Sequence, residues 1–139
     1  MNKIESFRGE YAFLSNFYPA TVELEGICFP TIENAFQAAK VMGAARKKFL
    51  NVTPGQAKAL GRKVTRRTDW FSVNLFIMED LVRQKFKNSA ELKKLLLATG
   101  DAEIIEGNNW NDTFYGVCRG VGRNELGKII MKVRGELSE

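Results

Sequence analysis

The chain has 139 residues, enough for one domain with a hydrophobic core. It contains no apolar run of about 18 residues, and its N-terminus lacks the apolar core of a signal peptide, so we expect a cytoplasmic protein that does not bind membranes. The absence of histidine excludes Ser-His and Cys-His nucleophile pairs and every histidine-based metal site. Acid–base chemistry therefore falls to Asp, Glu, Lys, Tyr or Cys, and neither a metal nor an organic cofactor is implied.

The net charge of +5 is unevenly distributed along the chain. A basic stretch between Val41 and Thr68 holds eight basic residues and no acidic one, whereas the other 13 basic residues are outnumbered by 16 acidic ones. The members of this stretch are Arg46, Lys47, Lys48, Lys58, Arg62, Lys63, Arg66 and Arg67. Such a local field suits a phosphate-bearing ligand or nucleic acid, and a solvated helical face explains it equally well.

In chain order, residues 4–19 are aromatic-rich and irregular. Val22 to Phe29 reads as a hairpin with Glu25-Gly26 at its turn. Both cysteines, Cys28 and Cys118, lie in apolar strand-like runs, which indicates buried free thiols.

Five helices are expected, each with a cap or proline signal at its start. Their starting residues and ranges are Thr31 for 32–45, Thr53-Pro54 for a helix ending near Gly61, Asp69 for 70–87, Ser89 for 90–98 and Asn124 for 125–137. The third helix carries an apolar stripe at Phe71, Leu75, Met78, Val82 and Phe86. With short strands at 103–106 and 114–118, the pattern predicts a mainly α (α+β) single domain over 1–139, with a small antiparallel β component.

The octad from Glu33 to Lys40 is the most informative stretch. At 100° per residue, Glu33, Gln37 and Lys40 lie within about 40° of one another on a helix, so an acid, an amide and an amine share one stripe. A neighbouring stripe, formed by Ile32, Phe36, Ala39 and Gly43, is apolar or small and can pack inward. An ordinary solvated surface pair is the alternative interpretation.

Two later segments combine polar and glycine residues. The loop from Asn108 to Gly116 mixes an acid, amides and aromatics, which suits base stacking and sugar binding or, equally, turn formation and core packing. The segment Gly120 to Gly127 is a glycine-rich helix start that could hold phosphate, and a cap with a close packing contact explains it as well.

The ordered set of these motifs resembles one family over nearly the whole chain. The set comprises Phe7-x-Gly9, Phe13-Leu14-Ser15-Asn16-Phe17-Tyr18-Pro19, Phe29-Pro30-Thr31, Glu33-x-x-x-Gln37-x-x-Lys40, Gly61-Arg62, Asp69-Trp70, Met78, Lys85-Phe86, Leu96, Thr99-Gly100, Glu106, Asp112-x-x-Tyr115-Gly116 and Gly122-x-Asn124-x-Leu126-Gly127. This pattern is similar to that of the NADAR (YbiA-like) N-glycosidases. At the position of Tyr115 the family more often has Trp. Tyr keeps a stacking face and adds a hydroxyl.

The resemblance implies a compact, mainly helical enzyme that hydrolyses C–N glycosidic bonds of ribosylated bases. Its expected substrates are phosphorylated N-ribosides, namely the ribosylaminopyrimidine phosphates of early riboflavin synthesis, or ADP-ribose attached to guanine in nucleic acid. The catalytic residues it implies are Glu33, Lys40 and Asp112. The substrate-binding residues it implies are Arg8, Gly9, Asn16, Phe17, Gln37, Trp70, Trp110, Tyr115, Gly116 and Asn124.

The chemistry of these residues and the family resemblance both predict hydrolysis through a transition state in which the ribose resembles an oxocarbenium ion. We expect Glu33 to stabilise the positive charge and orient water, and Asp112 to protonate the departing base from a loop whose apolar wall raises its pKa. Lys40 either holds a ribose or phosphate oxygen or attacks C1 of the opened sugar as a Schiff-base nucleophile. The rival hypotheses are a non-catalytic ADP-ribose or nucleotide-binding module and a nucleic-acid-binding protein that uses the basic stretch.

Overall fold

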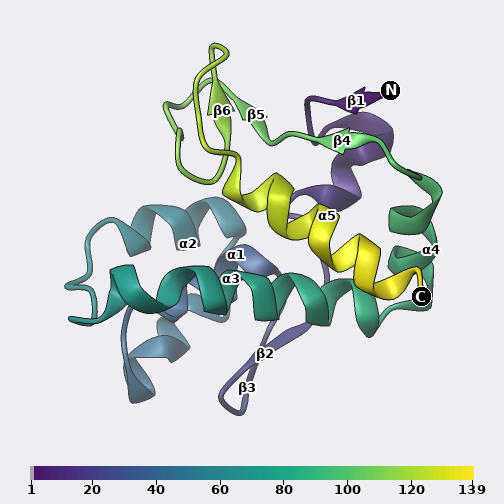
Figure 1. Cartoon of the computed structure of the whole chain (residues 1–139). Helices are drawn as coiled ribbons and strands as arrows, with labels where there is room; N and C mark the ends of the chain where they lie inside the picture. Colours follow the sequence, from purple (N-terminus) through teal and green to yellow (C-terminus); the bar gives the residue numbers. More distant parts are fainter. Residues whose placement is uncertain (1) are drawn as a thin grey trace. The chain divides into compact units, whose positions relative to one another are not determined.

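The computed structural model describes residues 2–139. The chain forms two compact units: a central unit, Asn16–Lys85, and a terminal unit that combines Met1–Ser15 with Phe86–Glu139. Helix α3 (Trp70–Lys87) is continuous and passes from the central unit into the terminal unit in its last residues (Figure 1).

The central unit begins with an antiparallel hairpin of β2 (Val22–Leu24) and β3 (Ile27–Phe29). Glu25 and Gly26 form its turn with φ of 46° and 89°, the left-handed conformations that a two-residue hairpin turn requires. The predicted hairpin is therefore confirmed. Strand alternation, however, points Cys28 to solvent, so the expectation that both thiols are buried is wrong for Cys28 and confirmed for Cys118.

Helix α1 (Ile32–Ala38) begins where predicted, because the Thr31 side chain accepts the N–H of Asn34 at 3.0 Å. It ends at Ala38 rather than at residue 45. The carbonyls just beyond it take other partners: that of Lys40 accepts the N–H of Arg67 at 2.7 Å, and that of Val41 accepts Arg46 Nε at 2.9 Å. The chain then forms the 3-10 helix η2 (Gly43–Phe49).

Helix α2 (Pro54–Gly61) has the predicted bounds, and Thr53 and Gln56 form a reciprocal capping box at its start. It packs against α1 (Figure 1). Asn34, which is fully buried on α1, holds the chain between the two helices: its Nδ2 donates to the carbonyls of Phe49 at 2.8 Å and Val52 at 3.0 Å.

Helix α3 matches its predicted range, but only three of the five residues in its predicted apolar stripe are buried. Met78, Val82 and Phe86 are buried as expected, whereas Phe71 is 78% exposed and Leu75 is also exposed. At the start of the helix the buried face is instead formed by Trp70 and Asn74, which are one turn apart.

The terminal unit contains two short parallel strand pairs. Strand β1 (Lys3–Ile4) pairs with β4 (Glu103–Ile104), and β5 (Gly107–Asn108) pairs with β6 (Val117–Cys118). The predicted small antiparallel β component is present as the β2–β3 hairpin, and the structure adds the two parallel pairs of the terminal unit. The parallel pairs join segments far apart in sequence or separated by a loop, which alternation patterns do not reveal.

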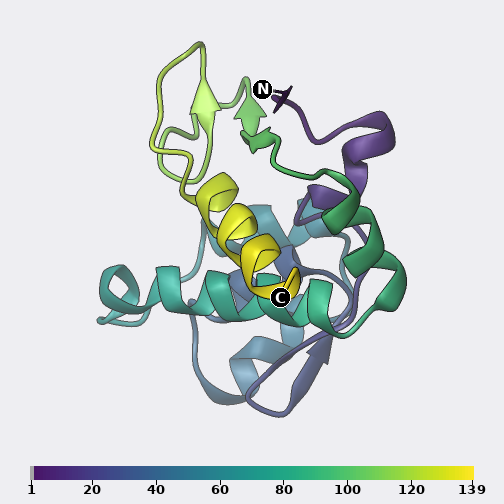
Figure 2. The same ribbon diagram turned by 45° about the vertical axis from the view of Figure 1, so that its right-hand side comes forward.

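The helices of the terminal unit are η1 (Gly9–Leu14, a 3-10 helix), α4 (Ala90–Ala98) and α5 (Glu125–Leu137). Ser89 caps α4 as predicted, since its Oγ accepts the N–H of Leu92 at 3.2 Å. Helices α4 and α5 lie side by side (Figure 2). The core side chains of this unit include Ile4, Phe13, Leu92, Leu96, Ile104, Leu126, Ile130 and Val133.

The start of α5 differs from expectation in its chemistry. Asn124 occupies the N-cap position with φ of 55°, but its side chain makes no cap hydrogen bond. It accepts the N–H of Glu106 at 3.0 Å and donates to the carbonyl of Ile104 at 2.9 Å. The N–H groups of Glu125 and Leu126 bond to carbonyls of the preceding loop, so they do not offer a phosphate site.

Among residues 2–139, no helix combines the length and apolar character needed to span a membrane. The mainly helical α+β class is confirmed by the elements described above.

We expect Asn34→Ala to lower the free energy of unfolding by about 2–4 kcal/mol, because it leaves the carbonyls of Phe49 and Val52 without their donor. Chemical denaturation measures this change. The control is Asn51→Ala, at an exposed position just before α2, which should stay within about 0.5 kcal/mol of the parent. Equal stability of the two variants would contradict this account of the α1–α2 connection.

Candidate active site

The acid and the amide predicted on α1 form a buried pair. Glu33 is 8% and Gln37 7% exposed, and Gln37 Nε2 donates to Glu33 Oε2 at 2.7 Å. The backbone N–H of Glu33 donates to the carbonyl of Asn16 at 3.1 Å, which fixes the segment before the hairpin against this turn of α1. The alternative interpretation, a solvated surface pair of Glu33 and Lys40, is therefore wrong for Glu33.

Two residues that form hydrogen bonds with Glu33, namely Gln37 and Asn16, each have a buried side-chain oxygen with no hydrogen-bond partner among the described residues. Because a carboxylate only accepts, Gln37 must turn its nitrogen towards Glu33, which leaves Gln37 Oε1 without a donor. Asn16 Oδ1 is likewise unpartnered, while its Nδ2 lies 3.5 Å from Met78 Sδ. A buried acceptor without a donor costs about 1–3 kcal/mol, so the pair suits a ligand that supplies O–H or N–H groups.

Lys40 lies just beyond the last turn of α1. Its Nζ donates to the carbonyl of Gly61 at 3.4 Å and lies 6.0 Å from the centre of the Trp70 ring. Burial lowers the pKa of Lys40. The negative charge of Glu33 opposes this shift, and the positive charges of Arg66 and Arg62 add to it. The amine is therefore easier to deprotonate than an ordinary lysine.

Asp112, in the terminal unit, organises its own loop. Its Oδ1 accepts the backbone N–H groups of Phe114 at 3.1 Å and Tyr115 at 2.9 Å. Burial, followed by the negative charges of Asp112 and Glu125, raises the pKa of Tyr115, so its phenol stays protonated and able to donate at neutral pH. The role of Asp112 as a proton donor stays a prediction.

Comparisons with known proteins identify the family of this chain. The family model of the NADAR domain matches residues 5–138. The chain belongs to the NADAR family. An N-glycosidase of Nostoc punctiforme is 36% identical over 135 residues, covering 91% of this chain and 86% of that protein. The N-glycosidase YbiA of Escherichia coli K12 is 35% identical over 134 residues, covering 93% of this chain and 83% of that protein.

The solved structure of E. coli YbiA has a TM-score of 0.84 and 34% identity, and the match covers 99% of this chain and 87% of that chain. A riboflavin biosynthesis protein of Vibrio vulnificus is 40% identical over 134 residues, but this chain spans only 36% of its length. This NADAR protein is a hydrolase of N-glycosyl bonds.

The structure divides the predicted NADAR site residues between the two units. It brings Glu33, Gln37 and Lys40 together in the central unit, beside Asn16. Trp70 is buried and packs its ring 5.1 Å from that of Phe36, and Phe17 is exposed. The terminal unit holds the others, which are Arg8, Gly9, Trp110, Asp112, Tyr115, Gly116 and Asn124.

Several predicted residues of the terminal unit have structural explanations. Gly116 is needed for packing, because a Cβ there would overlap with the carboxylate and carbonyl oxygens of Glu106. The side chain of Asn124 bonds to the backbone of Ile104 and Glu106, as described above. Arg8, Gly9 and Trp110 are exposed. Their substrate-binding roles stay predictions.

Lys85, for which no role was predicted from the sequence, is only 2% exposed. Its Nζ lies 5.7 Å from the centre of the Tyr18 ring, and burial lowers its pKa to about 7. Its position in the sequence could have drawn attention to it, because it lies one turn after Leu81 on the buried face of α3, where a lysine is unusual.

The basic stretch separates into residues with different partners. Arg46 is buried and forms a salt bridge with Glu25 at 3.0 Å, and Arg67 forms a bidentate salt bridge with Asp69. Arg62 and Arg66 are exposed and act on Lys40. These two residues place the positive field of the stretch next to the Glu33–Gln37–Lys40 cluster.

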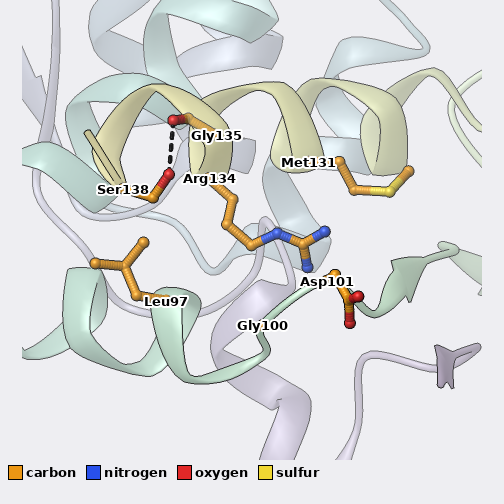
Figure 3. A pocket seen from close by; sticks show the side chains of 7 residues that line it. All are labelled: Leu97, Gly100, Asp101, Met131, Arg134, Gly135 and Ser138. Carbon is orange, nitrogen blue, oxygen red and sulfur yellow. Dashed lines mark hydrogen bonds between the residues drawn. The ribbon is translucent and has the colours of Figure 1, made fainter. Parts of the chain in front are cut away.

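A separate hollow lies in the terminal unit between the C-terminal parts of α4 and α5 (Figure 3). Its lining residues are Leu97, Gly100, Asp101, Met131, Arg134, Gly135 and Ser138. The Arg134 guanidinium donates to Thr99 Oγ1 at 3.0 Å and extends towards Asp101. None of the predicted site residues lines this hollow.

We expect Arg62→Gln with Arg66→Gln to raise the pKa of Lys40, since two positive charges that disfavour its ammonium form are removed. Less free amine is then present at pH 8, so acetylation of Lys40 by acetic anhydride, followed by peptide mass spectrometry, should slow. Glu33→Gln should have the opposite effect. Lys47→Gln, at an exposed position of η2, is the control. An unchanged rate in the double variant would separate the basic stretch from Lys40.

Proposed function

We propose that this NADAR protein hydrolyses the C–N bond of a phosphate-bearing N-riboside, with the ribosylaminopyrimidine phosphates of early riboflavin synthesis as the first candidate substrates. The observation that carries the proposal is the buried Glu33 carboxylate, together with the unpartnered side-chain oxygens of Gln37 and Asn16, the two residues that bond to Glu33. A carboxylate supports the developing charge on C1, and the acceptors suit the hydroxyls of a ribose.

In the proposed reaction, the bond between C1 and the base nitrogen breaks as positive charge grows on C1 and the ring oxygen. Glu33 stabilises this charge and accepts a hydrogen bond from the water that completes the hydrolysis. The base leaves with a proton, the water oxygen ends on C1, and ribose phosphate is the second product. A carboxylate in a site with little water acts more strongly than one in bulk solvent.

The preference for phosphate is supported by Arg62 and Arg66. Both are exposed, and both act electrostatically on Lys40 within the same unit. An anionic group of the substrate bound near these side chains would place its ribose next to the cluster. The name of the Vibrio vulnificus relative, a riboflavin biosynthesis protein, supports the ribosylaminopyrimidine class. ADP-ribose on guanine is the second class, since it also joins phosphate, ribose and a C–N bond.

We further propose that Lys40 is the nucleophile of the reaction rather than only an oxygen-binding group. Its pKa is lowered by burial and by Arg66 and Arg62, which favours the neutral amine that a nucleophile needs. The neutral Nζ attacks C1 of the ring-opened N-riboside, which carries the base as an imine, and forms an aminal. The bond between C1 and the base nitrogen then breaks, the base leaves with a proton, and an imine between C1 and Lys40 remains. Water adds to this imine, which releases ribose phosphate and restores the amine. The contact with the Gly61 carbonyl orients the same nitrogen.

The test of the activity is a panel of ribosylated bases, which includes a ribosylaminopyrimidine phosphate, its dephosphorylated form and an ADP-ribosylated guanine oligonucleotide, with free base followed by mass spectrometry. We expect release from a phosphorylated compound and about 10²–10³-fold slower release by Glu33→Gln, the loss found when one charge-stabilising group is removed. Glu10→Gln, at an exposed position, is the matched control. Ligand binding without release from any compound would support the binding-module alternative.

The test of Lys40 uses borohydride, which reduces an imine to a stable adduct. We expect a sugar adduct on Lys40 during turnover, and an inactive Lys40→Arg variant, because a guanidinium keeps the charge but is not nucleophilic at neutral pH. Lys47→Arg is the control. A partly active Lys40→Arg enzyme with no trapped adduct would show that Lys40 only binds an oxygen.

A further inference from the structure

Gly61, the last residue of α2, touches both functional partners of Glu33. Its carbonyl accepts Lys40 Nζ at 3.4 Å. A Cβ built on Gly61 would overlap with Gln37 Oε1 and come within 2.7 Å of Gln37 Cδ, where ordinary contact begins near 3.4 Å. The carboxamide of Gln37 therefore occupies the volume that any side chain at residue 61 would need.

Backbone conformation does not explain the glycine. Gly61 is the last residue of a regular helix and is absent from the positive-φ glycines, so an alanine would suit its backbone and even favour the helix. Glycine at this position instead costs helix stability, which indicates that close approach to α1 is what requires it.

We propose that Gly61 is a positioning residue for the reaction, because its missing side chain leaves the space in which the Gln37 carboxamide must lie to hold Glu33. The inference rests on the proposed function in naming Glu33 as the reacting group. Gln37 Nε2 reaches Glu33 Oε2 at 2.7 Å while the other end of its carboxamide lies against Gly61. The same contact directs the unpartnered Gln37 Oε1, the proposed acceptor for a substrate hydroxyl.

Gly61→Ala tests this inference without destroying the fold. The overlapping atoms are the far end of a flexible side chain, so the cheapest relief is rotation of Gln37 away from Gly61. We expect a folded variant whose kcat/KM falls about 100-fold, the loss produced by a small misplacement in an active site, with most of the loss in kcat. Gly55→Ala in the same helix is the matched control, since its Cβ would have no neighbour closer than Thr53 Oγ1 at 4.0 Å.

A double-mutant cycle with Gln37→Ala separates positioning from a general packing defect. The first readout is the pH profile of Lys40 acetylation, which does not depend on turnover. Loss of the Gln37 donor leaves the charge of Glu33 less compensated, so the pKa of Lys40 should rise in Gly61→Ala and in Gln37→Ala. Adding Gly61→Ala to Gln37→Ala should produce no further change in this profile or in kcat/KM.

Three results would overturn the inference: an acetylation profile and activity of Gly61→Ala equal to those of the parent, an equal effect of Gly61→Ala in the Gln37→Ala background, or a Gly61→Ala variant that fails to fold and is not rescued by Gln37→Ala. The two proposals fail in different ways. If no ribosylated base is cleaved but the acetylation cycle behaves as expected, the proposed function is wrong and the positioning role of Gly61 stands.

Discussion

Burial of the Glu33 carboxylate is the constraint on which the central unit depends. An ionised group taken out of water costs several kcal/mol unless hydrogen-bond donors and opposite charge replace its hydration. Gln37, one turn along α1, supplies a donor at 2.7 Å, and the ammonium of Lys40 supplies opposite charge. Both depend on α2, because Gly61 leaves room for the carboxamide and offers its carbonyl to Lys40. The same contacts between α1 and α2 therefore pack the two helices together and position the side chains of the cluster.

Local chemistry made much of the fold predictable from the sequence. Thr31, Thr53 and Ser89 each accept a backbone N–H in the first turn of the helix that follows, and such caps depend only on neighbouring residues. Glu25-Gly26 specifies the hairpin turn for the same reason. The Glu33–Gln37 bond was also predictable, since side chains four residues apart on a helix meet.

The rest depends on partners distant in sequence. The end of α1 at Ala38 could not be predicted, because it involves Arg67, far along the chain, bonding to the carbonyl of Lys40. Asparagine is a residue type that commonly caps helices, yet the side chain of Asn124 instead forms hydrogen bonds with the backbone of Ile104 and Glu106. Phe71 fits an apolar stripe but is exposed, with the guanidinium of Arg66 4.9 Å above its ring. For the site, the motif order indicated which residues matter, but the unpartnered oxygens of Gln37 and Asn16 emerged only from three-dimensional contacts.

The central claim is that the cluster around Glu33 binds the ribose of the substrate. The most direct measurement is a crystal structure of the Glu33→Gln variant with a C-nucleoside 5′-phosphate, whose carbon–carbon glycosidic bond cannot be hydrolysed. The account predicts that a ligand O–H or N–H lies within about 3.2 Å of Gln37 Oε1, with C1 of the sugar facing residue 33 and the phosphate near Arg62 and Arg66. A ligand bound elsewhere, with the oxygens of Gln37 and Asn16 still unpartnered, would contradict it.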